Sequence, residues 1–482
     1  MVKYKKILKW VRTKMGKTKI QIEKIIEKMR DFAKKKGIDI YLVGGYIRDN
    51  LLRKKSVDVD FVMEEDALKI ANEFSKMYNL PTPVFYGRFG TAMIEINGIK
   101  VEFATARKES YPDDTRKPIV EKCNIYQDLL RRDFTINAIA ENLITGEILD
   151  PFEGRQDIKR KIIKTPTDPD KTFYDDPLRI LRGIRFSTRL KFKIEDKTKE
   201  SMKKNVYRIK IVSQERITDE ILKIISATKP SDGFYLMDEI GVLEIVLPEV
   251  FSLKEKRTDH PCKDLFEHTL KTLDNISRHT RNVYLRFSAL IHDIGKPATL
   301  KVEDGKVSFH RHEFLGEKMS YKICKRMKIS DENAKFIGKL IRFHLRPHLL
   351  AKENPTDSAL RRFIKEVGKD IKALFTLAKA DITSKNEIKV KKAIEKLEKL
   401  EERIKEINKK DKLSSFKLAI DGFVIMDILT IKQGKEVGFV KNYLENLVLD
   451  GILPNKKTYL KRYLKENKKE ILHKIKKELQ LK

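Results

Sequence analysis

The chain has 482 residues, about three times the ~150-residue size of a typical domain, which predicts three or more structural units. Lysine and arginine number 104 against 71 aspartates and glutamates, so the net charge is +33. This excess favours a polyanionic partner, with nucleic acid as the first candidate. A hydrophobic content of 40% excludes global disorder.

Cysteine usage and apolar runs predict the compartment. The cysteines Cys123, Cys262 and Cys324 are far apart and form no CxxC pair, which is typical of reduced thiols inside a cell. No apolar run approaches the ~18 residues of a membrane span, and the basic N-terminus carries no cleavage signal. We therefore expect a soluble, cytoplasmic protein.

The first predicted element is a basic helical extension over residues 1–37. Its first 30 residues carry 11 basic and 2 acidic side chains, which suits either a solvated helix packed on its neighbour or an RNA-binding arm. From residue 38 the pattern changes to that of a small α/β domain. A short apolar strand ends at a glycine pair and a helix runs to Leu52, after which alternating apolar residues predict strands over 57–62, 91–96 and 99–105.

Helical periodicities dominate the chain beyond about residue 171, and we expect strands to be absent there. The predicted fold class is α+β, with a small mixed sheet followed by helical domains. Three polar stretches are candidate joints between domains: residues 164–169, 253–263 and 396–412. The last of these is equally consistent with one solvated helix.

The most informative segment joins a glycine pair to two aspartates. Gly44 and Gly45 follow a strand and open a helix, where backbone amides approach a phosphate closely. Asp58 and Asp60 are two apart on a predicted strand, so both carboxylates project from one face. Two carboxylates there repel each other unless a cation lies between them, and hard oxygen ligands suit Mg²⁺. Glu102, on a later strand, would add a third catalytic carboxylate.

This order of motifs resembles the class II tRNA nucleotidyltransferases, the CCA-adding enzymes and their poly(A) polymerase relatives. The resemblance is carried by LVGGYIRDNLL and DVDFV, and by residues 131–138 (RRDFTINA), 150–154 (DPFEG) and 175–179 (DDPLR). It implies a polymerase-β-like nucleotidyltransferase head over 38–165 and a helical neck over 166–252. The implied activity is template-independent addition of C and A to the tRNA 3′ end from CTP and ATP, with release of pyrophosphate.

The resemblance implies roles for the matching residues of the head. Two would bind the catalytic Mg²⁺: Asp58 and Asp60. Three would contact the triphosphate: Gly44, Gly45 and Arg48. Arg132 and Asp133 would read the ribose, since a carboxylate accepts a hydrogen bond from a 2′-hydroxyl, and Asn137 would hold that segment in place.

The neck would carry the template that selects the incoming base. Asp176 and Arg179 match the family's amino-acid template, which forms hydrogen bonds with the Watson–Crick edge of the nucleotide. A carboxylate accepts from the exocyclic amine that C and A carry and U lacks. The chain has Asp175 where the family usually has glutamate. Arg182 and Arg185 continue the basic helix face, where they would contact nucleotide phosphates or pair with acidic residues.

A second constellation lies within residues 253–400 and resembles the HD phosphohydrolase superfamily, whose metal ligands follow the order H…HD…H…H…D. The resemblance implies a primary site of four ligands, His268, His292, Asp293 and Asp381, with two more available for a second ion, His312 and His344. We prefer His312 to His310 because His312, Glu313 and Gly316 fit the family pattern better. Imidazole and carboxylate ligands suit Ni²⁺, Mn²⁺, Co²⁺ or Fe²⁺, and a metal-bound water of lowered pKa would attack a phosphoester.

Residues 401–482 predict a basic helical tail that resembles the tRNA-binding tail of bacterial CCA-adding enzymes. Such a tail would make sequence-independent contacts with phosphates. The implied partners are tRNA, ATP and CTP, with no membrane and no obligatory protein partner. Three alternatives stay open: a CC-only or A-only adding enzyme of a split pathway, a poly(A) polymerase, and a non-catalytic RNA-binding protein.

Overall fold

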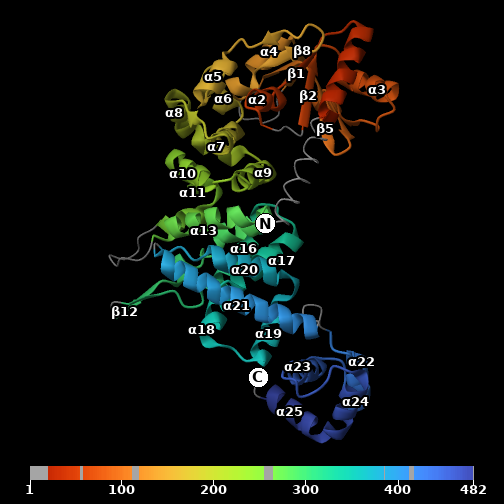
Figure 1. Ribbon diagram of the computed structural model, residues 1–482, viewed down its shortest axis with the longest axis vertical. Helices are drawn as coiled ribbons and strands as arrows, with labels where there is room; N and C mark the ends of the chain where they lie inside the picture. The colour runs from red at the N-terminus through yellow and green to blue at the C-terminus, as the bar shows by residue number, and fades with distance from the viewer. Residues whose placement is uncertain are drawn as a thin grey trace. The chain divides into compact units, whose positions relative to one another are not determined.

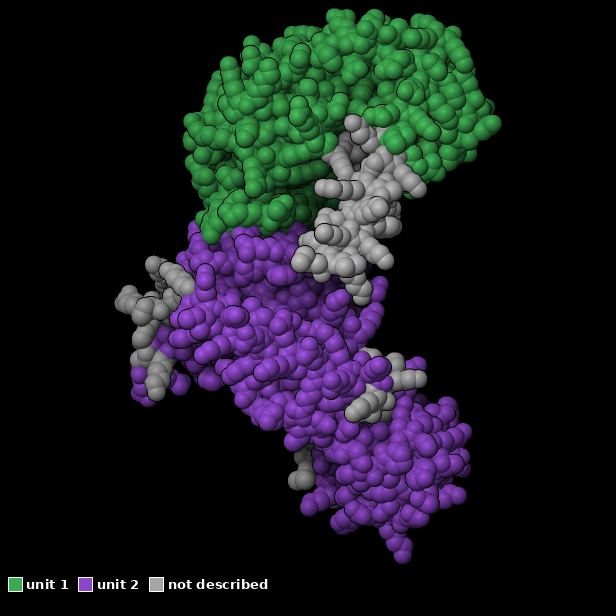
Figure 2. All heavy atoms as spheres, in the orientation of Figure 1, with its two compact units in different colours: residues 1–251 green, residues 252–482 purple. Residues whose placement is uncertain are grey.

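A computed structural model describes seven stretches of the chain, residues 20–54, 58–110, 119–254, 264–304, 306–384, 386–411 and 417–480. The chain divides into two compact units, residues 1–251 and 252–482 (Figure 2). The first unit contains a seven-stranded sheet with helices, whereas the second is almost entirely helical (Figure 1). The predicted α+β fold class is therefore confirmed.

The sheet of the first unit is mixed. Its strand order is β3-β4-β5-β2-β1-β8-β9, and only the pair β2–β5 is parallel. The strands are β1 (Ile40–Val43), β2 (Asp58–Met63), β3 (Val84–Tyr86), β4 (Thr91–Ile96), β5 (Ile99–Thr105), β8 (Ala140–Asn142) and β9 (Ile148–Leu149). Burial alternates along β5, where Val101 and Phe103 are buried and Lys100 and Glu102 are exposed. The three strands expected from alternation correspond to β2, β4 and β5.

A helix over residues 20–36 packs into the head. Phe32 is fully buried and meets the Phe74 ring of α3 (Ala67–Met77) edge to face at 5.7 Å, and Phe74 contacts Phe103 of the sheet at 5.8 Å. Arg30 Nε also donates to the Leu143 carbonyl (2.9 Å). Of the two interpretations of the N-terminal segment, the described part follows the packed helix. Residues 1–19 of the expected extension lie outside the described residues.

The remaining elements of the first unit are short. Beside the sheet lie α2 (Gly45–Leu51), the hairpin β6 (Arg107–Ser110) and β7 (Ile119–Lys122), α4 (Ile125–Leu130), α5 (Gly154–Arg160) and β10 (Ile162–Ile163). The neck consists of α6 (Pro169–Asp175), α7 (Leu178–Leu190), β11 (Lys193–Ile194), α8 (Asp196–Asn205), α9 (Gln214–Ile225), α10 (Ser231–Ile240), α11 (Val242–Val246) and α12 (Pro248–Phe251).

The second unit opens with α13 (Leu265–His279), α14 (Val283–Ile291) and α15 (Lys296–Thr299), followed by a hairpin, β12 (Lys301–Glu303) and β13 (Lys306–Ser308). Then come α16 (His312–Arg326), α17 (Asp331–Phe343), α18 (Arg346–Glu353), α19 (Asp357–Val367), α20 (Ile371–Ala380) and α21 (Glu387–Asp411). The strands β11, β12 and β13 correct the expectation that strands are absent beyond residue 171. Strands of two or three residues are too short to produce a readable alternation.

Helix α21 passes through the expected boundary at residue 400. It packs along α18, α19 and α20 (Figure 1), so the charged run over 396–412 belongs, as far as it is described, to one continuous helix. The tail beyond it has its own core, formed by α22 (Gly422–Leu429), α23 (Lys435–Leu449), α24 (Lys457–Glu466) and α25 (Lys468–Gln480). Ion pairs from α19 brace this core, with Arg362 bonded to Asp450 and Lys365 to Glu445.

None of the helices in the described part of the chain has the length and apolar character needed to cross a lipid bilayer.

Candidate active sites

The turn after β1 brings a backbone, a guanidinium and a carboxylate together. Gly44 has φ 71° and ψ −130°, a conformation that favours glycine, and it leads directly into α2. A Cβ added at Gly44 would lie 3.3 Å from both Arg132 Nη1 and Asp60 Oδ2. The absence of a side chain at this position therefore leaves the two charged groups accessible from the turn.

Three carboxylates share one face of the sheet next to that turn. Asp58 and Asp60 lie on β2, and Asp60 is paired in parallel register with Glu102 of β5. Side chains at positions i and i+2 and at paired positions of neighbouring strands lie on the same face. Burial, together with Glu102, raises the pKa of Asp60 to about 6, although Arg132 opposes the shift. A divalent cation with oxygen ligands would relieve this repulsion, so the donor set fits the expected Mg²⁺.

A chain of hydrogen bonds joins α2 to the neck helix α7. Arg48 Nη1 donates to Asn137 Oδ1 (2.6 Å), and Asn137 Nδ2 donates to Asp133 Oδ1 (2.9 Å). Arg182 Nε completes the chain by donating to Asp133 Oδ2 (2.7 Å). Burial favours the neutral form of Asp133, but Arg182 and Asn137 outweigh it and lower the pKa of this carboxyl to about 2. The four residues thus form one network in which Arg48, Asn137 and the ionised Asp133 are buried and Arg182 is partly exposed.

The expected template residues are held by partners within the first unit. Asp176 Oδ1 accepts from the Leu178 backbone N–H (3.2 Å), and Asp176 Oδ2 accepts from Arg216 Nη2 (2.9 Å). Arg179 Nη2 donates to the Arg131 carbonyl (2.7 Å). Arg216 was not among the residues predicted from sequence, because on the amphipathic helix α9 it is one of several polar and charged residues that alternate with the apolar ones.

The two further arginines of α7 have different partners. Arg182 pairs with Asp133, whereas Arg185 pairs with the buried Glu220 (Nε to Oε2, 2.9 Å). The Arg185 guanidinium also lies 4.3 Å from the centroid of the Phe186 ring. Of the two expected roles, contact with nucleotide phosphates and pairing with acidic residues, the described contacts show the pairing, and each pair joins α7 to a neighbouring segment.

The second unit brings all six expected HD ligands together. They form two groups of three residues whose ligand atoms all lie within 4.8 Å of one another. The first group is His268, His292 and Asp381, and the second is Asp293, His312 and His344. The adjacent pair His292-Asp293 supplies one ligand to each group, which places the two candidate ion positions side by side.

Hydrogen bonds at Nδ1 orient the imidazoles. Backbone carbonyls three residues earlier pair with Nδ1 of His292 (2.8 Å), His312 (2.8 Å) and His344 (2.6 Å), and Thr383 Oγ1 pairs with Nδ1 of His268 (2.7 Å). Since Nδ1 is occupied in each ring, Nε2 is the atom left for a metal. The Nε2 atoms of His312 and His344 approach to 3.4 Å.

Buried ligand atoms that face one another support metal binding. Nε2 of His292 and Oδ1 of both Asp293 and Asp381 are buried and make no hydrogen bond in the described structure, but Asp381 Oδ1 lies 2.9 Å from His268 Nε2 and 3.2 Å from His292 Nε2. Burial lowers the pKa of His292, but the two carboxylates outweigh it and raise the pKa to about 10. Burial and the nearby His292 lower the pKa of His344 to about 4. A mixed set of imidazoles and carboxylates with unsatisfied buried atoms fits a divalent transition metal.

His348 was missed by sequence analysis. Its Nε2 lies 3.8 Å from Asp381 Oδ2 and is buried without a hydrogen-bond partner in the described structure. The available signal was its position four residues after His344: His344 caps the end of α17, and His348 lies in the first turns of the next helix, α18. His310 is exposed, whereas His312 is buried at the centre, as the preference for His312 requires.

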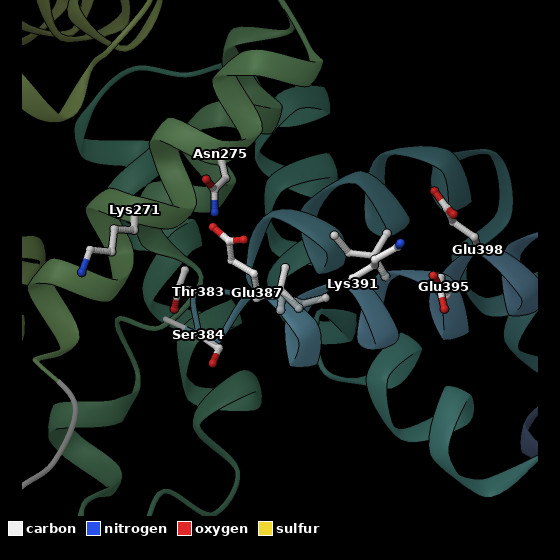
Figure 3. Close-up of a pocket in the computed structure, with 11 residues that line it drawn as sticks. Lys271, Asn275, Thr383, Ser384, Glu387, Lys391, Glu395 and Glu398 are labelled. Carbon is white, nitrogen blue, oxygen red and sulfur yellow. The ribbon is translucent and has the colours of Figure 1, made fainter.

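A pocket adjoins this cluster. Helices α13 and α21 and the segment 382–384 line it, with Asn275, Thr383 and Glu387 among the side chains shown in Figure 3. Thr383 belongs to both features, because its hydroxyl lines the pocket and pairs with His268.

Comparison with known families divides the chain in the same way. Residues 40–164 match the poly A polymerase head domain, and residues 191–253 match a domain described as a probable RNA and SrmB-binding site of polymerase A. Residues 265–393 match the HD domain.

Curated relatives carry names that agree with these matches. The chain is 38% identical over 221 residues to an A-adding tRNA nucleotidyltransferase of Aquifex aeolicus, which covers 45% of this chain and 26% of that protein. It is 36% identical to a CCA-adding enzyme of Lactobacillus helveticus, covering 49% of this chain and 58% of that protein. It is 32% identical over 308 residues to a multifunctional CCA protein of Aliivibrio salmonicida, covering 61% of this chain and 72% of that protein. The matched segment thus spans about a quarter of the first relative and just over half of the second.

Solved structures share the fold over most of the chain. The CCA-adding enzyme of Bacillus stearothermophilus, solved in complex with CTP, has a TM-score of 0.67 at 22% identity and covers 92% of this chain and 96% of its own. A tRNA nucleotidyltransferase complexed with a primer tRNA and an incoming ATP analog has a TM-score of 0.54 at 24% identity, covering 78% and 98%. With the multifunctional CCA protein matched over more than two thirds of its length, the chain belongs to the tRNA nucleotidyltransferase family that contains the CCA-adding enzymes, and it carries an HD domain.

Proposed function

We propose that this protein adds C and A nucleotides to the 3′ end of tRNA from CTP and ATP, without a nucleic-acid template. The observation that carries the proposal is the cluster of Asp58, Asp60 and Glu102 beside the Gly44 turn. The names of the relatives and the ligands of the solved structures point to the same reaction.

The reaction is a nucleotidyl transfer. The 3′-hydroxyl oxygen of the tRNA bonds to the α-phosphorus of the nucleotide, the bond from that phosphorus to the pyrophosphate oxygen breaks, and the hydroxyl proton leaves. Mg²⁺ bound by Asp58 and Asp60, with Glu102 beside them, would neutralise the charge that develops on the phosphates. Gly44, Gly45 and the buried Arg48 would adjoin the triphosphate.

Base and sugar recognition are assigned to the neck and to the adjoining head segment. Asp176 would accept a hydrogen bond from the exocyclic amine of C or A, and Arg179 would donate to an acceptor on the base edge. Asp133 would accept from the ribose 2′-hydroxyl, with Asn137 holding it in place (Nδ2 to Oδ1, 2.9 Å). Arg182 holds the second oxygen of the same carboxylate.

We further propose a phosphohydrolase activity for the HD domain. Domains of this kind typically use divalent metals, and the two ligand groups suit a pair of Ni²⁺, Mn²⁺, Co²⁺ or Fe²⁺ ions. Such an ion would supply a water of lowered pKa as nucleophile. His268 and Asp381 are the partly exposed members of the cluster, with 13% and 14% of their side chains accessible, so a phosphoester would approach from their side.

Two further regions expected from sequence, the basic tail and the neck, would contact the substrates. The basic tail would bind the tRNA backbone through phosphate contacts, and the neck would adjoin the nucleotide. A cytoplasmic location stays a prediction.

One assay tests the main proposal. Three tRNA transcripts, ending before the CCA sequence, after its second cytidine and after its terminal adenosine, are incubated with Mg²⁺ and with CTP, ATP or both. We expect the shortest to gain three nucleotides and extension to stop there. Arrest after two cytidines, or activity only with ATP on the second transcript, would identify a split-pathway enzyme, of which the Aquifex relative's name offers an example. Long adenosine tails would indicate a poly(A) polymerase, and no extension would contradict the proposal.

A further inference from the structure

The carboxylate of Asp128 lies at the centre of an arginine cluster beside the candidate nucleotide site. Asp128 is on α4 and is fully buried, with 0% exposure. Its Oδ2 accepts from Nε (3.2 Å) and Nη2 (3.0 Å) of Arg132, and its Oδ1 accepts from Nε (3.1 Å) and Nη2 (2.5 Å) of Arg131. The Arg107 backbone N–H also donates to Oδ1 (3.3 Å). These donors use the roughly four lone-pair sites of an ionised carboxylate.

This arrangement decides which part of Arg132 faces the site. Because Asp128 engages the Nε and Nη2 edge of the guanidinium, Nη1 is the nitrogen directed elsewhere. Nη1 donates to the Asn137 carbonyl (3.3 Å) and lies 3.3 Å from the point that a Cβ on Gly44 would occupy. Asp60 Oδ2 is also 3.3 Å from that point. Arg132 therefore presents one nitrogen to the turn that would hold the phosphates.

The buried carboxylate also restricts a flexible side chain. A long arginine side chain has considerable rotamer entropy, which must be lost when it binds a ligand. Two hydrogen bonds to Asp128 remove most of this freedom in advance, because they hold the guanidinium plane in one orientation. Burial favours the neutral form of Asp128, but Arg132 and Arg131 lower the pKa of its carboxyl, so the partner of both guanidinium groups is charged.

We propose that Asp128 is a positioning residue that presents Arg132 to the triphosphate of the incoming nucleotide. Asp128 acts through Arg132 and does not itself contact the nucleotide. The proposal rests on the proposed nucleotidyl transfer, and it changes the expected role of Arg132 from the ribose to the phosphates. The reason is position: Arg132 Nη1 lies beside Gly44 and close to the carboxylate expected to bind Mg²⁺.

Equilibrium binding of three probes to the full-length protein tests this assignment. The probes are CTP, dCTP and inorganic tripolyphosphate, each titrated with Mg²⁺ by isothermal calorimetry. For Asp128→Asn we expect the affinity of all three to fall by about tenfold, the loss typical of one charged hydrogen bond. Asp157→Asn is the matched control, since Asp157 is also buried and accepts from the Thr135 hydroxyl (2.7 Å). It should bind all three probes within about twofold of the wild type.

A second background shows whether Asp128 acts through Arg132. In an Arg132→Ala protein, adding Asp128→Asn should cause no further loss of tripolyphosphate affinity, because the group that Asp128 positions is gone. Unchanged tripolyphosphate binding in Asp128→Asn would overturn the proposal. If the affinity for CTP falls while the affinities for dCTP and tripolyphosphate stay unchanged, Arg132 contacts the ribose. This outcome would also overturn the proposal.

Two further measurements cover the cases in which Asp128→Asn does not fold or the wild type extends no tRNA. If Asp128→Asn does not fold, Arg132→Lys replaces it: lysine keeps the charge but cannot bond Asp128 through two nitrogens and face Gly44 as well. We expect about a tenfold loss of tripolyphosphate affinity, and full retention would overturn the proposal. If the wild type binds tripolyphosphate but extends no tRNA, the proposed function fails while the positioning of Arg132 is still tested by binding.

Discussion

Arg182 and Asp133 lie 49 residues apart in the sequence, yet the Arg182 Nε donates to Asp133 Oδ2 across 2.7 Å. This ion pair joins the neck helix α7 to the head segment that follows α4. Asp133 is 7% exposed and its second oxygen is held by Asn137, so the pair connects the expected sugar-binding carboxylate to the helix that carries the expected template. Because the Asp133 carboxylate is buried, removing the Arg182 guanidinium, which is itself 35% accessible, would leave that charge without its main partner and destabilise the fold.

This pair predicts a pH-dependent stability. The pKa of Asp133 is about 2 in the folded protein against a usual value of 3.8, so its contribution is fully present above pH 3.8 and is lost as the pH falls towards 2. The contribution amounts to about 2 kcal/mol. The difference in the free energy of unfolding between the wild type and Asp133→Asn, measured with urea, should therefore be larger at pH 5 than at pH 2. A difference that is constant over this range would contradict the prediction.

The carboxylate cluster predicts a separation of catalysis from RNA binding. Replacing both Asp58 and Asp60 by alanine should lower nucleotide incorporation by at least about 100-fold, because the proposed ligands of the catalytic metal are lost. The affinity for tRNA, measured by filter binding, should change by less than about threefold, since phosphate contacts elsewhere supply it. Incorporation at the wild-type rate would show that these residues are not the metal ligands.

The contact between Arg216 and Asp176 leads to a prediction about base selectivity. Its Nη2 holds one oxygen of Asp176 while the Leu178 N–H holds the other, so the carboxylate plane is fixed. Arg216→Ala should lower kcat/KM for CTP and ATP by about fivefold to tenfold and change kcat/KM for UTP less, since UTP offers no amine to Asp176. Lys204→Ala removes another exposed ion pair of the neck, with Asp170, and serves as the control. An equal loss for all nucleotides would show that Arg216 has no part in selectivity.

The HD cluster predicts two independent reactions in one chain. His292→Ala should reduce the content of bound transition metal, measured by elemental analysis, and should abolish hydrolysis of a 2′,3′-cyclic nucleotide. Nucleotide addition should stay within about twofold of the wild type, because His292 lies in the other unit. Loss of both activities would contradict separate sites.

Two glycines of the second unit predict opposite effects of alanine. A Cβ at Gly295 would lie 2.2 Å from the His312 carbonyl, so Gly295→Ala must displace the start of α16 and the ligand His312 with it. We expect a loss of about 1–3 kcal/mol in stability and about tenfold weaker metal binding. Gly438 is inside α23 and an added Cβ there has no neighbour within 4 Å, so Gly438→Ala should stabilise that helix by up to about 1 kcal/mol. Calorimetric unfolding would measure the stability of both variants, and metal titration would measure their metal affinity. Equal changes in stability for the two variants would contradict the packing argument.

Local patterns were sufficient where neighbours in the sequence are also neighbours in the fold. Alternation located β2, β4 and β5, and the spacing of Asp58 and Asp60 placed two carboxylates on one face before the pairing with Glu102 was visible. The resemblance to the HD superfamily, carried by the order of histidines and aspartates, likewise named the six candidate ligands that the structure brings together. In each case the side chains that carry the chemistry lie within a few residues of a strand or helix end.

Contacts between residues that are distant in the sequence could not be predicted from local patterns. The sequence displays Arg185 and Arg216 as basic residues on helix faces, and only the packing of α7 against α9 and α6 shows that one pairs with Glu220 and the other with Asp176. His348 looked like an ordinary histidine until the α18 helix placed its Nε2 near Asp381. The charged run over 396–412 was compatible with both a joint and a solvated helix, and only the structure shows that α21 continues through residue 400.

By itself the sequence determined the mixed sheet and the glycine turn with its carboxylates through local periodicity. Through its resemblance to known families it also gave the order of the domains and the six candidate metal ligands that the structure brings together. Only the tertiary structure decided which charges neutralise one another. Whether a buried carboxylate such as Asp128 stabilises the fold or aims an arginine depends on distances between segments. Those distances are set by side-chain packing, which no local pattern encodes.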